Sequence, residues 1–162
     1  MVELVSLARY ALGGLGLYFA QTQAADNPTL AVASASLFAV GFVGILSFVS
    51  HVLLHSGDAK MIGFSSKTPS FQYEVGFANL AFGVVAVTSY YQQWGIQANT
   101  VLLLAYSLYL LQAGILHLVE SQKSKKARRP NLTRAVATFV FSGTMLYFVA
   151  HAINSSAFLD RG

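Results

Sequence analysis

The chain has 162 residues, of which 55% are hydrophobic and only 10% are charged, against about 25% charged in an ordinary soluble domain. So few charges could not cover a soluble protein of this size, and the apolar residues come in long blocks. Composition therefore indicates a single domain, residues 1–162, embedded in a lipid bilayer. Because the sequence contains no cysteine, disulfides, iron–sulfur clusters and covalent haem attachment are excluded.

Five apolar blocks, taken in chain order, predict five membrane-spanning helices. Each block is long enough to cross roughly 30 Å of hydrocarbon at 1.5 Å per residue. Polar or helix-breaking segments separate them, among them a predicted loop from Ser56 to Ser70. Arg9 lies inside the first block, so the protein would have four spans if that block lay on the membrane surface. The predicted spans are Leu4–Thr22, Thr29–His55, Phe71–Tyr91, Ala98–Ser121 and Asn131–Asn154.

The distribution of basic residues predicts how these spans are oriented. With a cytoplasmic amino terminus and an outer carboxy terminus, nine Lys and Arg residues fall inside and only Arg161 falls outside. The net charge of +4 does not indicate nucleic acid, because the basic cluster is not interleaved with aromatic residues. The cluster from Lys123 to Arg129 is typical of a cytoplasmic loop and is suited to anionic lipid headgroups.

Small residues indicate which helix faces pack inside the bundle. In the second block, residues spaced three or four apart share one face: Gly41, Gly44, Phe48, His51 and His55. A comparable stripe in the third block consists of Gln72, Gly76, Asn79 and Gly83. Glycine allows close helix approach, so we expect these stripes to face other helices.

Ionisable residues from four spans are predicted to share one depth near the cytoplasmic face. They are His51, His55, Glu74, His117, Glu120 and Arg134. Such groups are costly in a membrane unless they are paired or face a wet interior. Gln72, Asn79 and Gln112 are expected to support this layer as interhelical hydrogen-bonding residues.

A metal site is the sharpest interpretation of this layer. His51 and His55 are four residues apart, His117 and Glu120 are three apart, and Glu74 offers a further oxygen ligand. Nitrogen and oxygen ligands without sulfur suit zinc, iron, manganese or copper. The hypothesis is therefore a small membrane protein that binds a metal ion or a protonatable ligand.

Other interpretations of the same residues stay open. His51 and His117 could be the axial ligands of a b-type haem. Alternatively, Glu74 and the histidines could handle protons in a transporter or channel. A purely structural interpretation makes His51 and Glu74 a buried pair and lets Glu120 pair with the basic cluster. A further hypothesis makes the chain a non-catalytic subunit or assembly factor of a larger membrane complex, and a homo-oligomer also stays open.

The stretch from Thr68 to Gly83 resembles a signature of small bacterial multi-pass membrane proteins of unknown function. In that family a Pro-Phe-Gln-x-Glu-Val-Gly-x-x-Asn-Leu run opens a central span; here Ser70 is inserted between Pro69 and Phe71. Ala113–His117 resembles a second part of that pattern, which lies at the end of the next span. The resemblance implies a bacterial or archaeal cell (inner) membrane and brings no activity. The expected bundle is also reminiscent of DoxX-like proteins, as an architectural analogy only.

Overall fold

The computed structural model describes residues 1–62, 69–123 and 125–159, and this part of the chain consists of helices joined by short turns, with no strand. The helices are α1 (Val2–Gln23), α2 (Pro28–Ala35), η1 (Ser36–Phe42), α3 (Val43–Phe48), η2 (Val49–Leu53), α4 (His55–Ile62), α5 (Ser70–Tyr91), α6 (Gly95–Lys123), α7 (Lys125–Ile153) and α8 (Ser156–Leu159). The two η segments are π-helical turns within one continuous path from α2 to Leu53.

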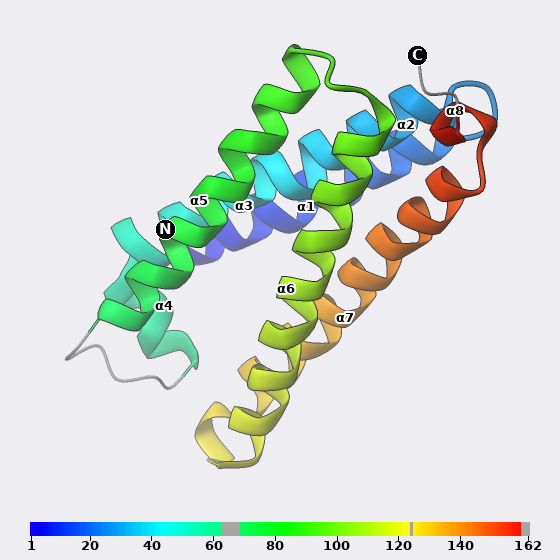
Figure 1. Cartoon of the computed structure of the whole chain (residues 1–162). Coiled ribbons are helices and arrows are strands. Elements are labelled where there is room, and N and C mark those ends of the chain that lie inside the picture. Colours follow the sequence, from blue (N-terminus) through cyan, green and yellow to red (C-terminus); the bar gives the residue numbers. More distant parts are fainter. Residues whose placement is uncertain (63–68, 124, 160–162) are drawn as a thin grey trace.

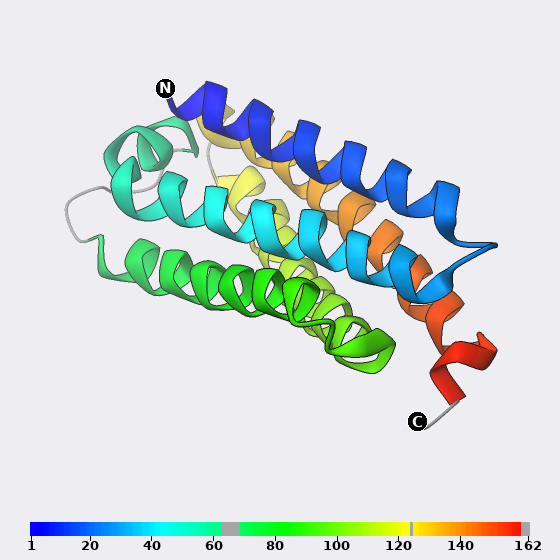
Figure 2. The ribbon, with the colours of Figure 1, turned by 90° about the horizontal axis from the view of Figure 1, so that it is seen from above.

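The long helices form one bundle whose connections alternate between two ends (Figures 1 and 2). The amino terminus, α4 and the α6–α7 junction lie at one end. The α1–α2 turn, the α5–α6 turn and α8 lie at the other (Figure 2). The path from α2 to η2 runs through the middle of the bundle, with α1 on one side and α5 on the other (Figure 2).

Three helices in the described ranges are long and apolar enough to cross a membrane. They are Pro28–Leu53, Gly95–Lys123 and Ala127–Ile153, and they correspond to the second, fourth and fifth predicted spans. The first and third predicted spans fall on α1 and α5, which have 22 residues each but do not reach the same apolarity. Polar and charged residues lower the apolarity of both helices: Glu3 and Arg9 on α1, and Gln72, Glu74 and Asn79 on α5.

Apolar side chains cover the outside of the bundle, whereas many polar ones lie inside it. Exposed large hydrophobic residues include Leu15 on α1, Phe77 on α5 and Val101 on α6. Ser107 and Thr100, both buried on α6, donate their hydroxyl hydrogens to the carbonyl oxygens four residues earlier. An apolar exterior around a hydrogen-bonded interior is the arrangement that lipid favours.

The glycine stripes lie where the sequence predicts them, between packed helices. A Cβ on Gly44 would lie 2.6 Å from the carbonyl oxygen of Asn79, and one on Gly83 would lie 2.9 Å from that of Gly41. Glycine therefore allows the backbones of η1, α3 and α5 to touch. This fixes the distance between the central path and α5, and with it the position of Asn79.

Two predicted loops are wrong. Residues 55–62 form helix α4 rather than part of a loop from Ser56 to Ser70, and 63–68, with Lys67, lie outside the described residues. The predicted basic loop is likewise helical on both sides of residue 124, because Lys, Arg and Ala are good helix formers. Pro130 lies within α7, where it removes one backbone N–H from the helical ladder.

Candidate functional site

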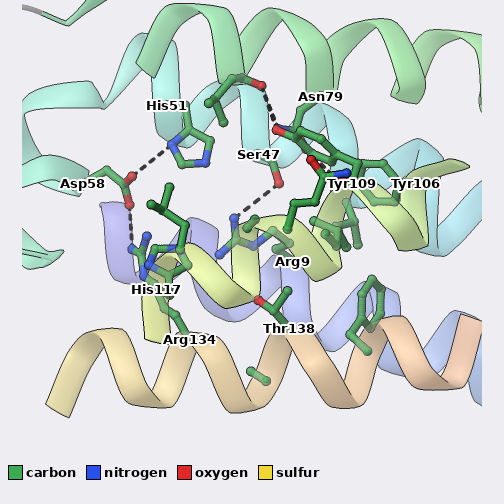
Figure 3. Close-up of a pocket in the computed structure, with 18 of the residues that line it drawn as sticks. Arg9, Ser47, His51, Asp58, Asn79, Tyr106, Tyr109, His117, Arg134 and Thr138 are labelled. Carbon is green, nitrogen blue, oxygen red and sulfur yellow. Dashed lines mark hydrogen bonds and ion pairs between the residues drawn. The ribbon is translucent and has the colours of Figure 1, made fainter. Parts of the chain in front are cut away.

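A cavity of about 300 Å³ lies inside the bundle, bounded by residues of α1, α3, η2, α4, α5, α6 and α7 (Figure 3). Its apolar walls include Val43, Val75, Leu110, Leu116 and Phe141. Its polar groups come from helices that are far apart in the sequence. A cavity with mostly apolar walls and a few convergent polar groups is typical of a small-molecule site.

A buried ion pair closes one side of this cavity (Figure 3). Arg134 Nη2 donates to Asp58 Oδ1 at 2.6 Å, and both residues are at least nine-tenths buried. His51 Nδ1 lies 3.1 Å from the other carboxylate oxygen of Asp58. The three side chains come from η2, α4 and α7, so this cluster joins the central path to the last long helix.

The turn after η2 explains how His51 and Asp58 meet. The N–H of Leu54 donates to the carbonyl of Val49, a π-type bond that widens the last turn before the helix breaks at Leu54. The chain then re-enters a helix at His55, and Gly57 packs against Val2 at the start of α1. This turns α4 back, so that Asp58 lies beside His51.

Burial would raise the pKa of the Asp58 carboxyl, but the imidazole of His51 and the charge and hydrogen bond of Arg134 outweigh it. The net effect holds the pKa of Asp58 well below its ordinary value. Asp58 is therefore a fixed negative charge, and it is matched to Arg134.

Arg9 supplies a second guanidinium to the cavity, from α1. Its Nη1 donates to Ser47 Oγ at 3.3 Å (Figure 3). Its guanidinium lies 5.2 Å from the ring centre of Tyr10. In the described ranges Arg9 has no carboxylate within ion-pair distance. Among the charged residues that line the cavity, only Arg9 lacks an opposite charge.

His117 enters the cavity from α6, and Asn131 fixes the state of its ring. The Asn131 amide nitrogen donates to the carbonyl of Ala127, which leaves its oxygen to face His117 Nδ1 at 2.8 Å. That oxygen can only accept, so Nδ1 carries the hydrogen and Nε2 is left available for a ligand.

A third polar group in the cavity is built on Asn79. The hydroxyl of Tyr106 donates to its amide oxygen at 2.8 Å, and its amide nitrogen donates to the hydroxyl of Tyr109 at 2.8 Å and to the carbonyl of Val75 at 2.7 Å. Asn79 thus satisfies the buried Tyr106 and the partly buried Tyr109 of α6 and ties α5 to that helix. By contrast, Gln72 has a buried side-chain oxygen without a hydrogen-bond partner in the described residues, and it too lines the cavity.

The model of a family of unknown function, DUF6790, matches residues 4–156. The chain belongs to this family. No curated protein and no solved structure matches the chain. The match to DUF6790 confirms the expected membership of a family of unknown function. It does not test the motif between Thr68 and Gly83 or the likeness to DoxX-like proteins.

Six of the residues that sequence reasoning selected in this DUF6790 chain line the one cavity: His51, Gln72, Asn79, Gln112, His117 and Arg134. Three others do not line it. Glu74 is exposed on α5, Glu120 pairs with Lys123 at 2.5 Å, and His55 Nδ1 lies 3.2 Å from the carbonyl of Val52. The buried partner of His51 is therefore Asp58 rather than Glu74.

In the described ranges no group of three or more His, Asp or Glu side chains could hold a metal ion. Metal binding by the DUF6790 chain remains a prediction from its sequence. The two histidines in the cavity each present Nδ1 to a protein oxygen. This leaves Nε2 as the atom available to a ligand.

Sequence reasoning missed Asp58, Arg9, Ser47 and Asn131. The sequence predicts a loop at Asp58, although this residue follows His51 by seven residues, which is two helical turns. Arg9 enters the sequence analysis only as the residue that leaves the number of spans at four or five. The signal in both cases is a charged residue within or next to an apolar block, which in a membrane protein usually faces the interior.

Proposed function

We propose that this chain is a five-span membrane protein that binds a small protonatable ligand in its internal cavity. The observation that carries the proposal is the convergence of Arg9, His51, Asp58, His117 and Arg134 on one cavity, from five different helices, inside a bundle with an apolar exterior. Ionisable groups at such a position are costly, and they usually mark a ligand or ion site.

The outer surfaces of α1 and α5 support counting them as spans beside the three more apolar helices. Each has 22 residues, about 33 Å of helix at 1.5 Å per residue, which matches the hydrocarbon thickness. Leu4, Leu7 and Phe19 are exposed on α1, and Phe77 and Val84 on α5. Lipid contact accounts for these side chains better than water does.

Charge supports a cytoplasmic amino terminus. The Lys and Arg residues in the described ranges all fall in the helix segments nearer the end that holds the amino terminus and the α6–α7 junction, while 24–28, 92–95 and 154–159 contain none. By the positive-inside rule the basic end faces the cytoplasm. The composition and the resemblance in the third span favour the cell membrane of a bacterium or archaeon.

The cavity offers a protonatable ligand both donors and acceptors. Arg9 offers N–H donors, Gln72 offers an unpartnered oxygen, and His117 offers Nε2. Asp58 and Arg134 neutralise each other, so they shape the site rather than provide its free charge.

Mass spectrometry of the intact protein after mild detergent extraction tests the proposal, by asking whether a small molecule is retained. Ala113→Phe places a ring in the cavity lining of α6, whereas Leu108→Phe changes a residue that is 49% exposed on the same helix and does not line the cavity. We expect a retained molecule in the wild type and in Leu108→Phe, and its loss in Ala113→Phe. Equal retention in both variants, or none in any preparation, would contradict the proposal.

The same samples test the metal and haem interpretations of His51 and His117. Near-stoichiometric metal that falls in both alanine variants would make the ligand a metal ion, and a Soret band would make it haem. A molecule that is retained without metal or colour leaves the site to an organic ligand.

A further inference from the structure

We propose that the ligand is a long-chain carboxylate, with its head group on Arg9 and its alkyl chain in a groove between α1 and α7. This rests on the proposed function and names the ligand class of the same cavity. Two observations carry it: an unmatched guanidinium in the cavity, and an apolar groove that begins where the cavity ends.

The charge balance of the cavity selects an anion. Arg134 is matched by Asp58 at 2.6 Å, whereas Arg9 donates to the Ser47 hydroxyl, lies over the Tyr10 ring and has no carboxylate within ion-pair distance in the described residues. A half-buried guanidinium within a membrane span is stabilised by an opposite charge. A carboxylate fits its planar fork with two hydrogen bonds, which makes Arg9 the anchor.

The groove adjoins the cavity, because Tyr10, Ala137 and Phe141 line both. It has a volume of about 550 Å³. Along α1 it runs from Tyr10 to Gln21, about 16 Å of helix at 1.5 Å per residue. Its length and its position beside Arg9 suit one extended alkyl chain.

Apolar walls line most of this groove: Leu17 on α1, and Val140, Phe141 and Phe148 on α7. Gly14 also lines it, and a Cβ at Gly14 would meet no atom within 4 Å. The groove is therefore open at this point, and one larger side chain there can fill it. Among the described residues that line the cavity, Arg9 is the cation without a carboxylate partner, and one groove adjoins it there, which favours one chain and one negative charge over a two-chain lipid.

Binding of radiolabelled palmitate to the purified full-length protein in a non-ionic detergent tests this inference. Competitors separate the two parts of the ligand: methyl palmitate lacks the charge, and butyrate lacks the chain. Dodecyl phosphate distinguishes a carboxylate from another anion. We expect unlabelled palmitate to displace the label at a concentration on the order of tenfold or more below that of any of the other three.

Variants test the two halves of the site separately. Arg9→Gln should weaken palmitate binding by about tenfold or more, and Arg9→Lys by less, since it keeps the charge but loses the fork. Gly14→Leu should abolish binding by filling the groove. Gly143→Leu is the matched control, because a Cβ at Gly143 also meets nothing within 4 Å and Gly143 does not line the groove. Thermal unfolding of each variant confirms that it folds.

Equal competition by palmitate and methyl palmitate, or unchanged binding in a folded Arg9→Gln variant, would overturn the proposal. Equal effects of Gly14→Leu and Gly143→Leu on palmitate binding would contradict the assignment of the alkyl chain to the groove. The cavity can still retain another molecule that Ala113→Phe removes, so failure here differs from failure of the proposed function. Palmitate binding that Ala113→Phe leaves intact would place the anion outside the cavity and overturn this proposal, while the retained-molecule experiment would still decide the proposed function.

Discussion

Asp58 and Arg134 are 76 residues apart in the sequence and form a buried ion pair with 2.6 Å between Oδ1 and Nη2. The pair joins α4, which follows the central path, to α7, the last long helix. Removing one partner of such a pair leaves a charge buried without its counter-ion, which costs more than the pair itself contributes.

We therefore expect Arg134→Gln to destabilise the bundle by about 3–5 kcal/mol. The double variant Asp58→Asn/Arg134→Gln should recover much of this loss, because it leaves no buried charge. Glu120→Gln is the control, since Glu120 pairs with Lys123 on the exposed side of α6 and is worth about 0–1 kcal/mol. Denaturant unfolding in detergent measures all three, and a double variant as unstable as the single one would contradict this account.

The lowered pKa of Asp58 predicts a stability difference that depends on acid. A carboxyl whose folded pKa lies below its unfolded value, about 3.9, stabilises the fold fully above that value and loses this contribution as the pH falls through the folded pKa. The stability of the wild type relative to Asp58→Asn should therefore be largest near pH 5 and shrink below about pH 4. Unfolding of both proteins between pH 5 and pH 2.5 measures it, and a difference that grows with acid would have the wrong sign.

The close approach of α3 and α5 predicts that a larger residue at Gly44 lowers the stability of the protein. A Cβ there would lie 2.6 Å from a backbone oxygen and 3.2 Å from the Cα of Gly83, neither of which can move alone. We expect Gly44→Ala to destabilise by about 1–3 kcal/mol. Gly143→Ala has open space at its Cβ and should be neutral or stabilising by up to about 1 kcal/mol. Similar stabilities for the two variants would contradict the packing described.

The hydrogen bonds of Asn79 predict that a substitution there lowers the stability of the protein even when no side-chain volume is lost. Asn79→Leu leaves the hydroxyls of Tyr106 and Tyr109 without their amide partner, at a cost of about 1–3 kcal/mol. Tyr106→Phe in the same background should restore part of the stability, because it removes one orphaned hydroxyl. Thermal unfolding shows whether the effects of the two substitutions on stability add. Simple additivity would mean that Asn79 and Tyr106 do not interact, which would contradict the hydrogen bond described.

Because the chain has no cysteine, its topology can be tested with single cysteines. We expect a cysteine at Gln93, in the α5–α6 turn, to react with a membrane-impermeant maleimide in intact cells. A cysteine at Lys125, in the α6–α7 junction, should react only after the membrane is opened. Both positions are exposed on the protein, so access depends on the membrane alone. The reverse pattern would invert the proposed orientation.

Much of the cavity lining could be predicted from helix faces and depth. His51 lies on a glycine stripe that packing turns inward, His117 and Arg134 lie at the predicted depth, and Gln72 and Asn79 share a face with two glycines of α5. Depth also predicts Glu74 in this layer, but Glu74 lies two residues from Gln72, about 200° around the helix, and is exposed. Helical phase, rather than depth alone, decides which acid enters the bundle.

The position of Asp58 could not be predicted because it depends on a tertiary contact. The segment after Leu54 contains Gly57 and reads as a loop, yet it is helical where it packs against the start of α1 and the ion pair with Arg134 holds it. Propensity is a weak guide when a buried charge pair determines the local fold. The same holds for Asn131, whose role depends on His117 of the neighbouring helix.

A side-chain-resolution experimental map of the wild-type protein in a lipid nanodisc tests the central claim most directly. The account predicts non-protein density in the cavity beside Arg9 and His117, with the Asp58–Arg134 pair intact and α1 and α5 in contact with lipid. A cavity filled by its own side chains, or one that holds only water open to the bulk, would contradict it.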